Sequence, residues 1–264
     1  MAIKIAAAAS LINGLPQIIS AFNGQGGIYE EIEVCVPWYA SSGALARRII
    51  GTQFPKIFPD IFIAASEDAM DLVANFSVPN PPPSSLVSNR EDIIGNTLVI
   101  VKNANAGGLT LAGNSFGAVN SGNAALSGVH IWIANPDAPD YVPAGIYARE
   151  AFKLYTPDAN HWDYVFGKAT SEGTLGSDVQ KTLDGVVTDP GPAIGVVYNS
   201  DAKNECSVTI IAVADPPIND SIIYPAAQIY RSGQDDGEIE AFLEFLDSPT
   251  AQGILLSKGF RELN

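Results

Sequence analysis

Four short runs of small residues stand where a segment typical of a strand gives way to one typical of a helix. They occupy residues 7–11, 39–43, 141–145 and 177–179. The first N–H groups of a helix have no acceptor within the helix, and the helix dipole favours negative charge there. Small side chains let a ligand come close to the backbone, so these runs predict a binding site for an anion. Two runs lie early and two late in the chain, which predicts two domains that face one ligand.

Each polar residue near these runs also has a simpler interpretation when it is taken alone. Ser10, Ser42 and Ser177 are most simply helix N-caps, since serine is strongly preferred at that position. Tyr198 is most simply a core aromatic residue whose hydroxyl finds a backbone partner. A single junction therefore does not define a site, and only the set of junctions does.

The histidines and cysteines predict no second site. His130 and His161 lie on unrelated segments, and no cysteine or further histidine completes a metal shell around them, so we expect no metal site. Cys35 and Cys206 lie far apart, each in a strand-like run. Two buried thiols are the simpler expectation for them, with one disulfide as the alternative.

The elements that must position the junctions alternate between strand and helix, which predicts an α/β architecture with mostly parallel strands. We expect strands at residues 4–8, 33–37, 61–64, 97–101, 130–134, 194–198 and 208–213. We expect helices at residues 13–22, 43–51, 67–74, 144–154, 178–185 and 237–245, and a last helix that starts near Pro249 with Asp247 or Ser248 as its cap. Residues 76–89 carry four prolines among serines and asparagines, which predicts an extended surface loop. Residues 104–128 are rich in Gly, Asn, Ala and Ser, so we expect a surface insertion with little core of its own.

Composition excludes several classes of function. The formal net charge of -15 repels phosphate backbones, so nucleic-acid binding is not expected. The same charge repels small anions at long range, so an anion site must depend on short-range hydrogen bonds. No run of about 18 apolar residues exists, so no membrane span is expected. With 264 residues, 47% of them hydrophobic, the chain is long enough for two folded domains.

From Ser10 to Asn264 the chain resembles the periplasmic molybdate-binding proteins of ABC transport systems. The matching segments are AAASL at 7–11, YASSGALAR at 39–47, PDIFIAAS at 59–66, GNTLVI at 95–100, VPAGIYARE at 142–150, GVVYNSDA at 195–202 and GF at 259–260. Each segment alone is weak evidence, but their order and spacing match almost end to end, apart from the two insertions.

The resemblance implies a two-lobed type II periplasmic binding protein fold, with two mixed, mostly parallel sheets, a ligand cleft and a two-strand hinge. Domain I would comprise residues 1–96 and 225–264, and domain II residues 97–224. The resemblance also implies a binding protein without enzyme activity or cofactor, which is a monomer and delivers molybdate or tungstate to an ABC transporter permease. We expect Met1 to stand where a signal peptide was removed, and the protein to be periplasmic or otherwise extracytoplasmic.

The family's ligand residues can be transferred position by position. The oxyanion would be held by the hydroxyls of Ser10 and Ser42, the amides of Ala144 and Val179, and the hydroxyl of Tyr198. Archaeal relatives add two carboxylates to form an octahedral shell. No equivalent carboxylate stands beside Ala144, so tetrahedral binding is favoured.

Three alternatives stay open at the level of sequence. The same neutral donors would also serve sulfate, phosphate or another tetrahedral oxyanion. A serine-dependent hydrolase would use Ser10 or Ser42 as nucleophile, but it needs an adjacent base that neither histidine is placed to supply. The sensing half of a transcription regulator would need a helix-turn-helix and a basic surface, and the sequence contains neither.

Overall fold

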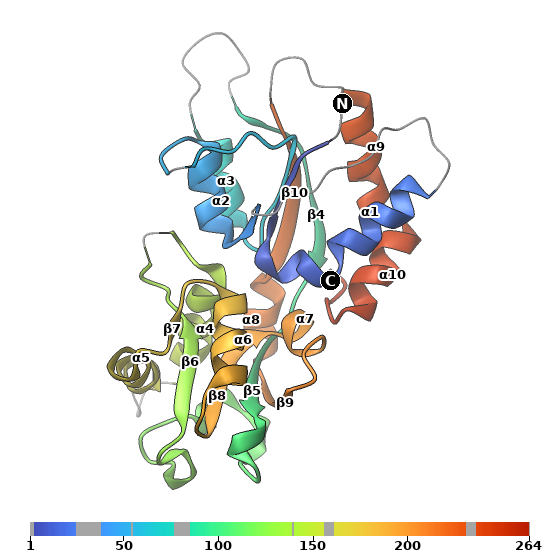
Figure 1. Ribbon diagram of the computed structural model, residues 1–264. Helices are drawn as coiled ribbons and strands as arrows, with labels where there is room; N and C mark the ends of the chain where they lie inside the picture. The colour runs from blue at the N-terminus through green and yellow to red at the C-terminus, as the bar shows by residue number, and fades with distance from the viewer. Residues whose placement is uncertain are drawn as a thin grey trace. The chain divides into compact units, whose positions relative to one another are not determined.

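The structure is a computed structural model that describes residues 3–24, 38–53, 55–76, 85–138, 140–155, 161–230 and 236–263. The chain divides into two compact units, one formed by Met1–Gly95 with Ile223–Asn264 and the other by Asn96–Ile222. Each unit has its own five-stranded sheet with helices packed against it (Figure 1). The predicted α/β class with two mixed sheets is therefore confirmed.

The sheet of the first unit has the order β2-β1-β3-β10-β4. Its strands are β1 (Ile5–Ala8), β2 (Tyr39–Ala40), β3 (Ile61–Ile63), β4 (Val87–Gly95) and β10 (Ile223–Ile229). Strand β1 pairs in parallel with both β2 and β3, whereas β10 runs antiparallel to β3 and β4. The carboxyl ends of β1, β2 and β3 consequently lie at one edge of the sheet, where the chain enters helices.

Helices flank both sides of this sheet (Figure 1). They are η1 (Ala9–Asn13), α1 (Leu15–Asn23), α2 (Ser42–Ile49), α3 (Glu67–Ala74), α9 (Asp236–Leu246) and α10 (Pro249–Ser257). The core beneath α2 and α3 contains Leu45, Phe62, Met70 and Ala227, all fully buried. Strand β1 is buried at all four residues because helices cover both of its faces, so its sequence carries no polar alternation.

The sheet of the second unit has the order β7-β6-β8-β5-β9. Its strands are β5 (Leu98–Asn103), β6 (His130–Ala134), β7 (Leu175–Gly176), β8 (Ala193–Tyr198) and β9 (Val208–Val213). Strand β6 pairs in parallel with β7 and β8, and β5 runs antiparallel to β8 and β9. As in the first unit, three parallel strands therefore end at one edge.

The helices of the second unit are α4 (Pro143–Lys153), α5 (His161–Glu172), α6 (Val179–Thr188), α7 (Asn199–Ala202) and α8 (Pro216–Ser221). Helix α6 packs on β6 and β8 at close range, and two glycines make this possible. A Cβ on Gly185 would lie 2.2 Å from the Trp132 ring, and one on Gly195 would lie 2.4 Å from the Val186 side chain.

Several expectations about the elements were wrong, and the reasons are physical. Parallel pairs do not outnumber antiparallel ones, since each sheet has two of each kind. In the first unit both antiparallel pairs involve β10, which was missed together with β4, whereas in the second unit they join the expected strands β5, β8 and β9. Strand β4 exposes much of its polar first half, and β10 contains Pro225 at a register shift, which is where a strand tolerates proline. Helices α5, α7 and α8 were also not expected.

The insertions and cysteines differ from expectation as well. Residues 104–128 form the short 3-10 helices η2 (Ala104–Ala106), η3 (Ala112–Asn114), η4 (Phe116–Ala118) and η5 (Ala124–Leu126). They bury Leu111, Phe116, Val119 and Leu126, so this insertion has a core after all. Cys206 is free and exposed in a turn before β9, not buried in a strand. Cys35, the strand expected at 33–37, and most of the insertion at 76–89 lie outside the described residues.

Adding a methyl group at Gly185 tests the packing of α6. Gly185→Ala should lower the free energy of unfolding by about 1–3 kcal/mol, because the new Cβ meets a Trp132 ring that is held by a hydrogen bond to Asp189. The new Cβ of Gly167→Ala, on α5, meets nothing within 4 Å, so this substitution should raise the free energy of unfolding by about 0.5–1 kcal/mol. Urea unfolding measures both changes. Equal effects of the two substitutions would contradict this packing.

Candidate functional site

Ser10 and Ser42 lie at the same edge of the first unit's sheet. Residues Ala8 and Ala40 are paired across the parallel strands β1 and β2, and each serine follows its paired alanine by two positions. Both serines are about 1% exposed. The third parallel strand, β3, contributes the amide of Ala65, which donates to Ser42 Oγ at 2.8 Å. The fold therefore brings together two hydroxyls that are 32 positions apart in the sequence.

Ser42 does not act as the N-cap of α2. That role belongs to Ser41, whose Oγ accepts the amide of Ala44 at 3.4 Å. Ser42 is the first helical residue, and its oxygen accepts the Ala65 amide. A hydroxyl that accepts an N–H keeps its own proton for donation to another group. The Ser42 hydroxyl is thus suited to bind an acceptor such as an oxyanion.

Ser10 has a hydroxyl partner that the sequence did not reveal. Its Oγ lies 2.7 Å from Tyr224 Oη, on β10, 214 positions away. Tyr224 is fully buried, and its ring packs edge-on against Phe260 at a centroid distance of 5.4 Å. This packing fixes the Tyr224 hydroxyl, which in turn fixes the position of Ser10 Oγ. Tyr224 is a positioning residue that only the three-dimensional structure could identify.

Tyr39 adds a buried hydroxyl close to these serines in the sequence. It belongs to β2, two residues before Ser41. Its Oη is buried and has no hydrogen-bond partner among the described residues. Burial raises the pKa of Tyr39 from 10.0 to about 12, so the phenol is a neutral hydrogen-bond donor at all physiological pH values.

Ala144 and Val179 begin helices at one edge of the second unit's sheet. Helix α4 has Pro143 in its first turn, which fits because proline lacks the N–H that would have no acceptor there. Ala144 is the second residue of α4, and Val179 is the first residue of α6. By position their N–H groups have no acceptor within their own helices. Both residues are at most 5% exposed.

Close packing places the start of α4 directly against the end of β6. A Cβ on Gly145 would lie 2.3 Å from the carbonyl oxygen of Ala134, the last residue of β6. Asp178, not Ser177, is the N-cap of α6, and its carboxylate accepts the Lys181 amide at 2.8 Å. Ser10, Ser42 and Ser177 were considered as helix N-caps. The N-cap of α2 is instead Ser41, and that of α6 is Asp178.

Tyr198 is the last residue of β8, which runs parallel to β6. The parallel strands β7, β6 and β8 therefore lead to Val179, Ala144 and Tyr198 at the same edge of this sheet. Tyr198 is 2% exposed. It is a core aromatic residue, and it also stands at the strand end where the two helix starts lie.

A buried carboxyl group, Asp201 on α7, lies beside this edge. Asp201 is 1% exposed, and its Oδ1 accepts Nε2 of Gln180, the second residue of α6, at 2.5 Å. Its Oδ2 has no hydrogen-bond partner among the described residues. Burial, and next the charge of Asp178, raise the pKa of Asp201 from 3.8 to about 8. The sequence segment GVVYNSDA contained this residue, but nothing in the sequence indicated that it is buried.

The two histidines lie elsewhere. His130 Nδ1 is 2.9 Å from the Asp189 carboxylate, at the opposite end of β6 from Ala134. His161 Nε2 is 2.9 Å from the Gly117 carbonyl oxygen. Within the described part of the chain, no group of three or more His, Cys, Asp or Glu side chains is placed to hold a metal ion.

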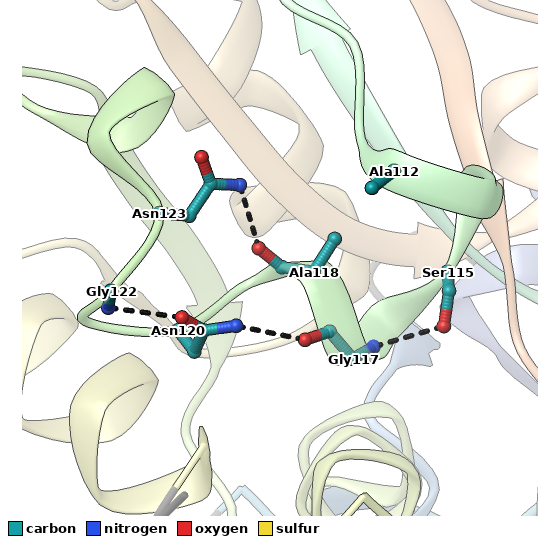
Figure 2. Close-up of a pocket in the computed structure, with 7 residues that line it drawn as sticks. All are labelled: Ala112, Ser115, Gly117, Ala118, Asn120, Gly122 and Asn123. Atoms are coloured by element: carbon teal, nitrogen blue, oxygen red, sulfur yellow. Dashed lines mark hydrogen bonds between the residues drawn. The ribbon is translucent and has the colours of Figure 1, made fainter.

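A shallow depression in the second unit is lined by residues of the insertion at 104–128 (Figure 2). Its Asn and Ser side chains bond within the segment: Asn120 to Gly117 and Gly122, Asn123 to Ala118, and Ser115 to Gly117. The insertion follows the end of β5, which is antiparallel to β8, so it lies at the opposite end of the sheet from Tyr198. This depression is distinct from the edge that carries the helix starts.

In each of the two α/β units, three parallel strands end at one edge of the sheet, and neutral hydrogen-bond donors follow these ends. This is the construction of a solute-binding protein. The chain belongs to the family of bacterial extracellular solute-binding proteins, which matches residues 3–261. Among the described residues, no helix is both long and apolar enough to cross a membrane.

Individual relatives agree with this family. The chain is 28% identical to the molybdate-binding protein ModA of Escherichia coli over 260 residues, which cover 98% of this chain and 88% of that relative. The periplasmic molybdate-binding protein of Azotobacter vinelandii is 17% identical, with a TM-score of 0.67, covering 99% of this chain and 100% of that one. The sulfate-binding protein SubI of Mycobacterium tuberculosis is 14% identical, with a TM-score of 0.70, covering 100% of this chain and 88% of that one. Below 25% identity these structures establish the fold alone.

Replacing Asp201 tests its buried, protonated state in the absence of any ligand. The folded protein holds this proton up to about pH 8, whereas the unfolded chain releases it near pH 4. Ionisation therefore favours the unfolded state, and the free energy of unfolding falls as pH rises between these values. Asp201→Asn removes this effect and keeps the oxygen that accepts Gln180. The variant should therefore gain stability over the wild type by about 1.4 kcal/mol per pH unit within this window.

Denaturant unfolding at several pH values from 5 to 8 measures the difference. Asp184→Asn is the matched control, because Asp184 lies on α6 with a side chain that is 60% exposed. Its stability difference from the wild type should not change with pH. A constant difference for Asp201→Asn as well would contradict the raised pKa.

Proposed function

We propose that this chain binds molybdate, and also tungstate, outside the cytoplasm and delivers it to the permease of an ABC transporter. The observation that carries the proposal is the 28% identity with the molybdate-binding protein of Escherichia coli, which extends over 98% of the chain. The neutral donors gathered at the strand ends of each unit supply a chemistry that fits such a ligand.

In this proposal the oxygens of the anion accept hydrogen bonds from five residues. The first unit contributes the hydroxyls of Ser10 and Ser42, and the second the amides of Ala144 and Val179 and the hydroxyl of Tyr198. The orientation of Ser42 by the Ala65 amide supports this assignment, because it leaves the serine proton available. The proposal divides the chain into domain I, at residues 1–96 and 225–264, and domain II, at residues 97–224.

Uncharged donors suffice to hold a dianion. Each hydrogen bond to a charged group contributes about 1.5–3 kcal/mol, and the helix N-termini add a favourable field. A rigid set of donors also selects a ligand by the distance between its oxygens. It offers no acceptor to the proton of a protonated phosphate. The net charge of -15 then weakens only the long-range attraction of the anion.

Binding rather than catalysis fits the contacts of the two serines. In the described contacts, Ser10 Oγ bonds to a tyrosine hydroxyl and Ser42 Oγ to a backbone amide. A serine nucleophile needs a base such as histidine within hydrogen-bond distance. His130 and His161 are engaged with Asp189 and Gly117 instead.

Sulfate or phosphate is the alternative ligand. The chain is similar in fold to a sulfate-binding protein, so this alternative is tested beside molybdate. The four oxyanions should be compared by competition titration calorimetry. We expect molybdate and tungstate to bind tightly and to displace sulfate and phosphate. Tight binding of sulfate or phosphate without binding of molybdate would contradict the proposal.

Removal of either serine hydroxyl should weaken molybdate binding. Ser10→Ala and Ser42→Ala should each raise the dissociation constant about 10- to 150-fold, since each deletes one hydrogen bond worth about 1.5–3 kcal/mol to a charged ligand. Ser248→Ala is the matched control, because Ser248 caps α10 through the Ala251 amide and has no role in the proposed site. Titration calorimetry measures all three variants. Wild-type affinity in both test variants would refute the site assignment.

A further inference from the structure

Asp201 is the one acidic side chain among the described residues that is fully buried beside proposed ligand residues and leaves a carboxyl oxygen without a partner. Its Oδ1 is bonded to Gln180, which directly follows Val179, and the carboxyl also accepts the backbone N–H of Tyr198. The group therefore lies between the two elements that supply Val179 and Tyr198 to the anion. Neither the sequence nor the proposed function gives it a role.

Of the described residues, those that face Asp201 offer no positive charge. Helix α6 presents Asp178, which is negative, and the neutral Gln180. Strand β8 presents Tyr198. Strand β9 contains no charged residue, and Lys102 of β5 pairs with Ile194 near the far end of β8, where its amine bonds to the carbonyls of Gly107 and Leu109. An ionised Asp201 would thus be a buried, uncompensated charge.

We propose that Asp201 is a proton-carrying residue of the oxyanion site, which must be a neutral carboxylic acid when the dianion is bound. The inference rests on the proposed function and concerns the charge state of that same site. The carbonyl oxygen of the neutral acid, Oδ1, still accepts Gln180 Nε2, so Asp201 keeps Gln180 and the start of α6 in place without adding a negative charge. Capture of the anion by a molecule in which Asp201 is ionised then takes up one proton from solution.

The physical reason is the low dielectric of the site. Two like charges near one another in a protein interior repel strongly, so a dianion and a carboxylate cannot both be accommodated without cost. Burial and Asp178 already raise the pKa of Asp201 to about 8 in the empty site. A bound dianion raises it further, and by linkage the ionised carboxylate weakens anion binding.

The test is the pH dependence of molybdate affinity, measured by titration calorimetry between pH 6 and 10, where molybdate remains a dianion. Wild-type affinity should be constant at the acidic end and fall up to tenfold per pH unit above the pKa of Asp201. Asp201→Asn should flatten this fall. At the alkaline end, the same titration in two buffers of different ionisation enthalpy should show uptake of up to one proton per anion by the wild type and none by Asp201→Asn.

A second variant keeps the inference testable if Asp201→Asn does not fold. Asp178→Asn preserves the N-cap of α6, since asparagine caps as well as aspartate, but removes the negative charge that acts on Asp201. The pKa of Asp201 should then fall, and the loss of affinity should begin at a lower pH than in the wild type. The control Asp184→Asn, on the same helix but exposed, should leave the onset unchanged.

The outcomes separate this inference from the proposed function. Failure of the wild type to bind molybdate at any pH would overturn the proposed function and the inference with it. Molybdate binding with the same pH profile in the wild type and Asp201→Asn would overturn the inference alone. The inference alone would also be overturned if the loss of affinity in Asp178→Asn began at the same pH as in the wild type or at a higher pH.

Discussion

The construction of both units depends on one constraint, namely that the first N–H groups of a helix have no acceptor inside that helix. In an α/β sheet, parallel strands end at the same edge and each is followed by a helix, so donors without helical partners gather there. In the second unit, β7, β6 and β8 bring the amides of Val179 and Ala144 and the side chain of Tyr198 to one edge. In the first unit, the donor at the corresponding edge is a serine hydroxyl after each of β1 and β2.

The hydroxyls need more support than the amides, because a serine side chain can rotate while an amide is fixed by its helix. Both serines receive that support from residues distant in sequence. Ser42 Oγ accepts the Ala65 amide from the end of β3, and Ser10 Oγ pairs with the hydroxyl of Tyr224 on β10. The antiparallel strand β10 thus orients the Ser10 hydroxyl as well as completing the sheet. Preorganised donors of this kind lose little entropy when a ligand binds.

The sequence predicted the elements best where local patterns agree with the final packing. The observed bounds of β6, β9 and α3 are the expected ones, because their β-branched runs and the Ser66 cap are local signals. Ser248 was correctly expected as a possible cap of α10. Strands β4 and β10 were missed since exposed polar residues and Pro225 hide their pairing, which depends on partners far away in the chain.

The site could be predicted only in part, for a similar reason. The junctions and the serines were visible as small residues at strand ends, but the choice between Ser41 and Ser42 as helix cap depends on backbone geometry. The contact of Ser10 with Tyr224 spans 214 positions and leaves no local signal. Asp201 looks like any polar residue after a strand, and only its complete burial distinguishes it.

The central proposal is that neutral donors at these strand ends bind an oxyanion, and a crystal structure of the chain with molybdate tests it most directly. The account predicts molybdate oxygens within hydrogen-bond distance of the hydroxyls of Ser10 and Ser42 and of the amides of Ala144 and Val179. Molybdate held instead by Arg or Lys side chains, away from these four residues, would contradict it.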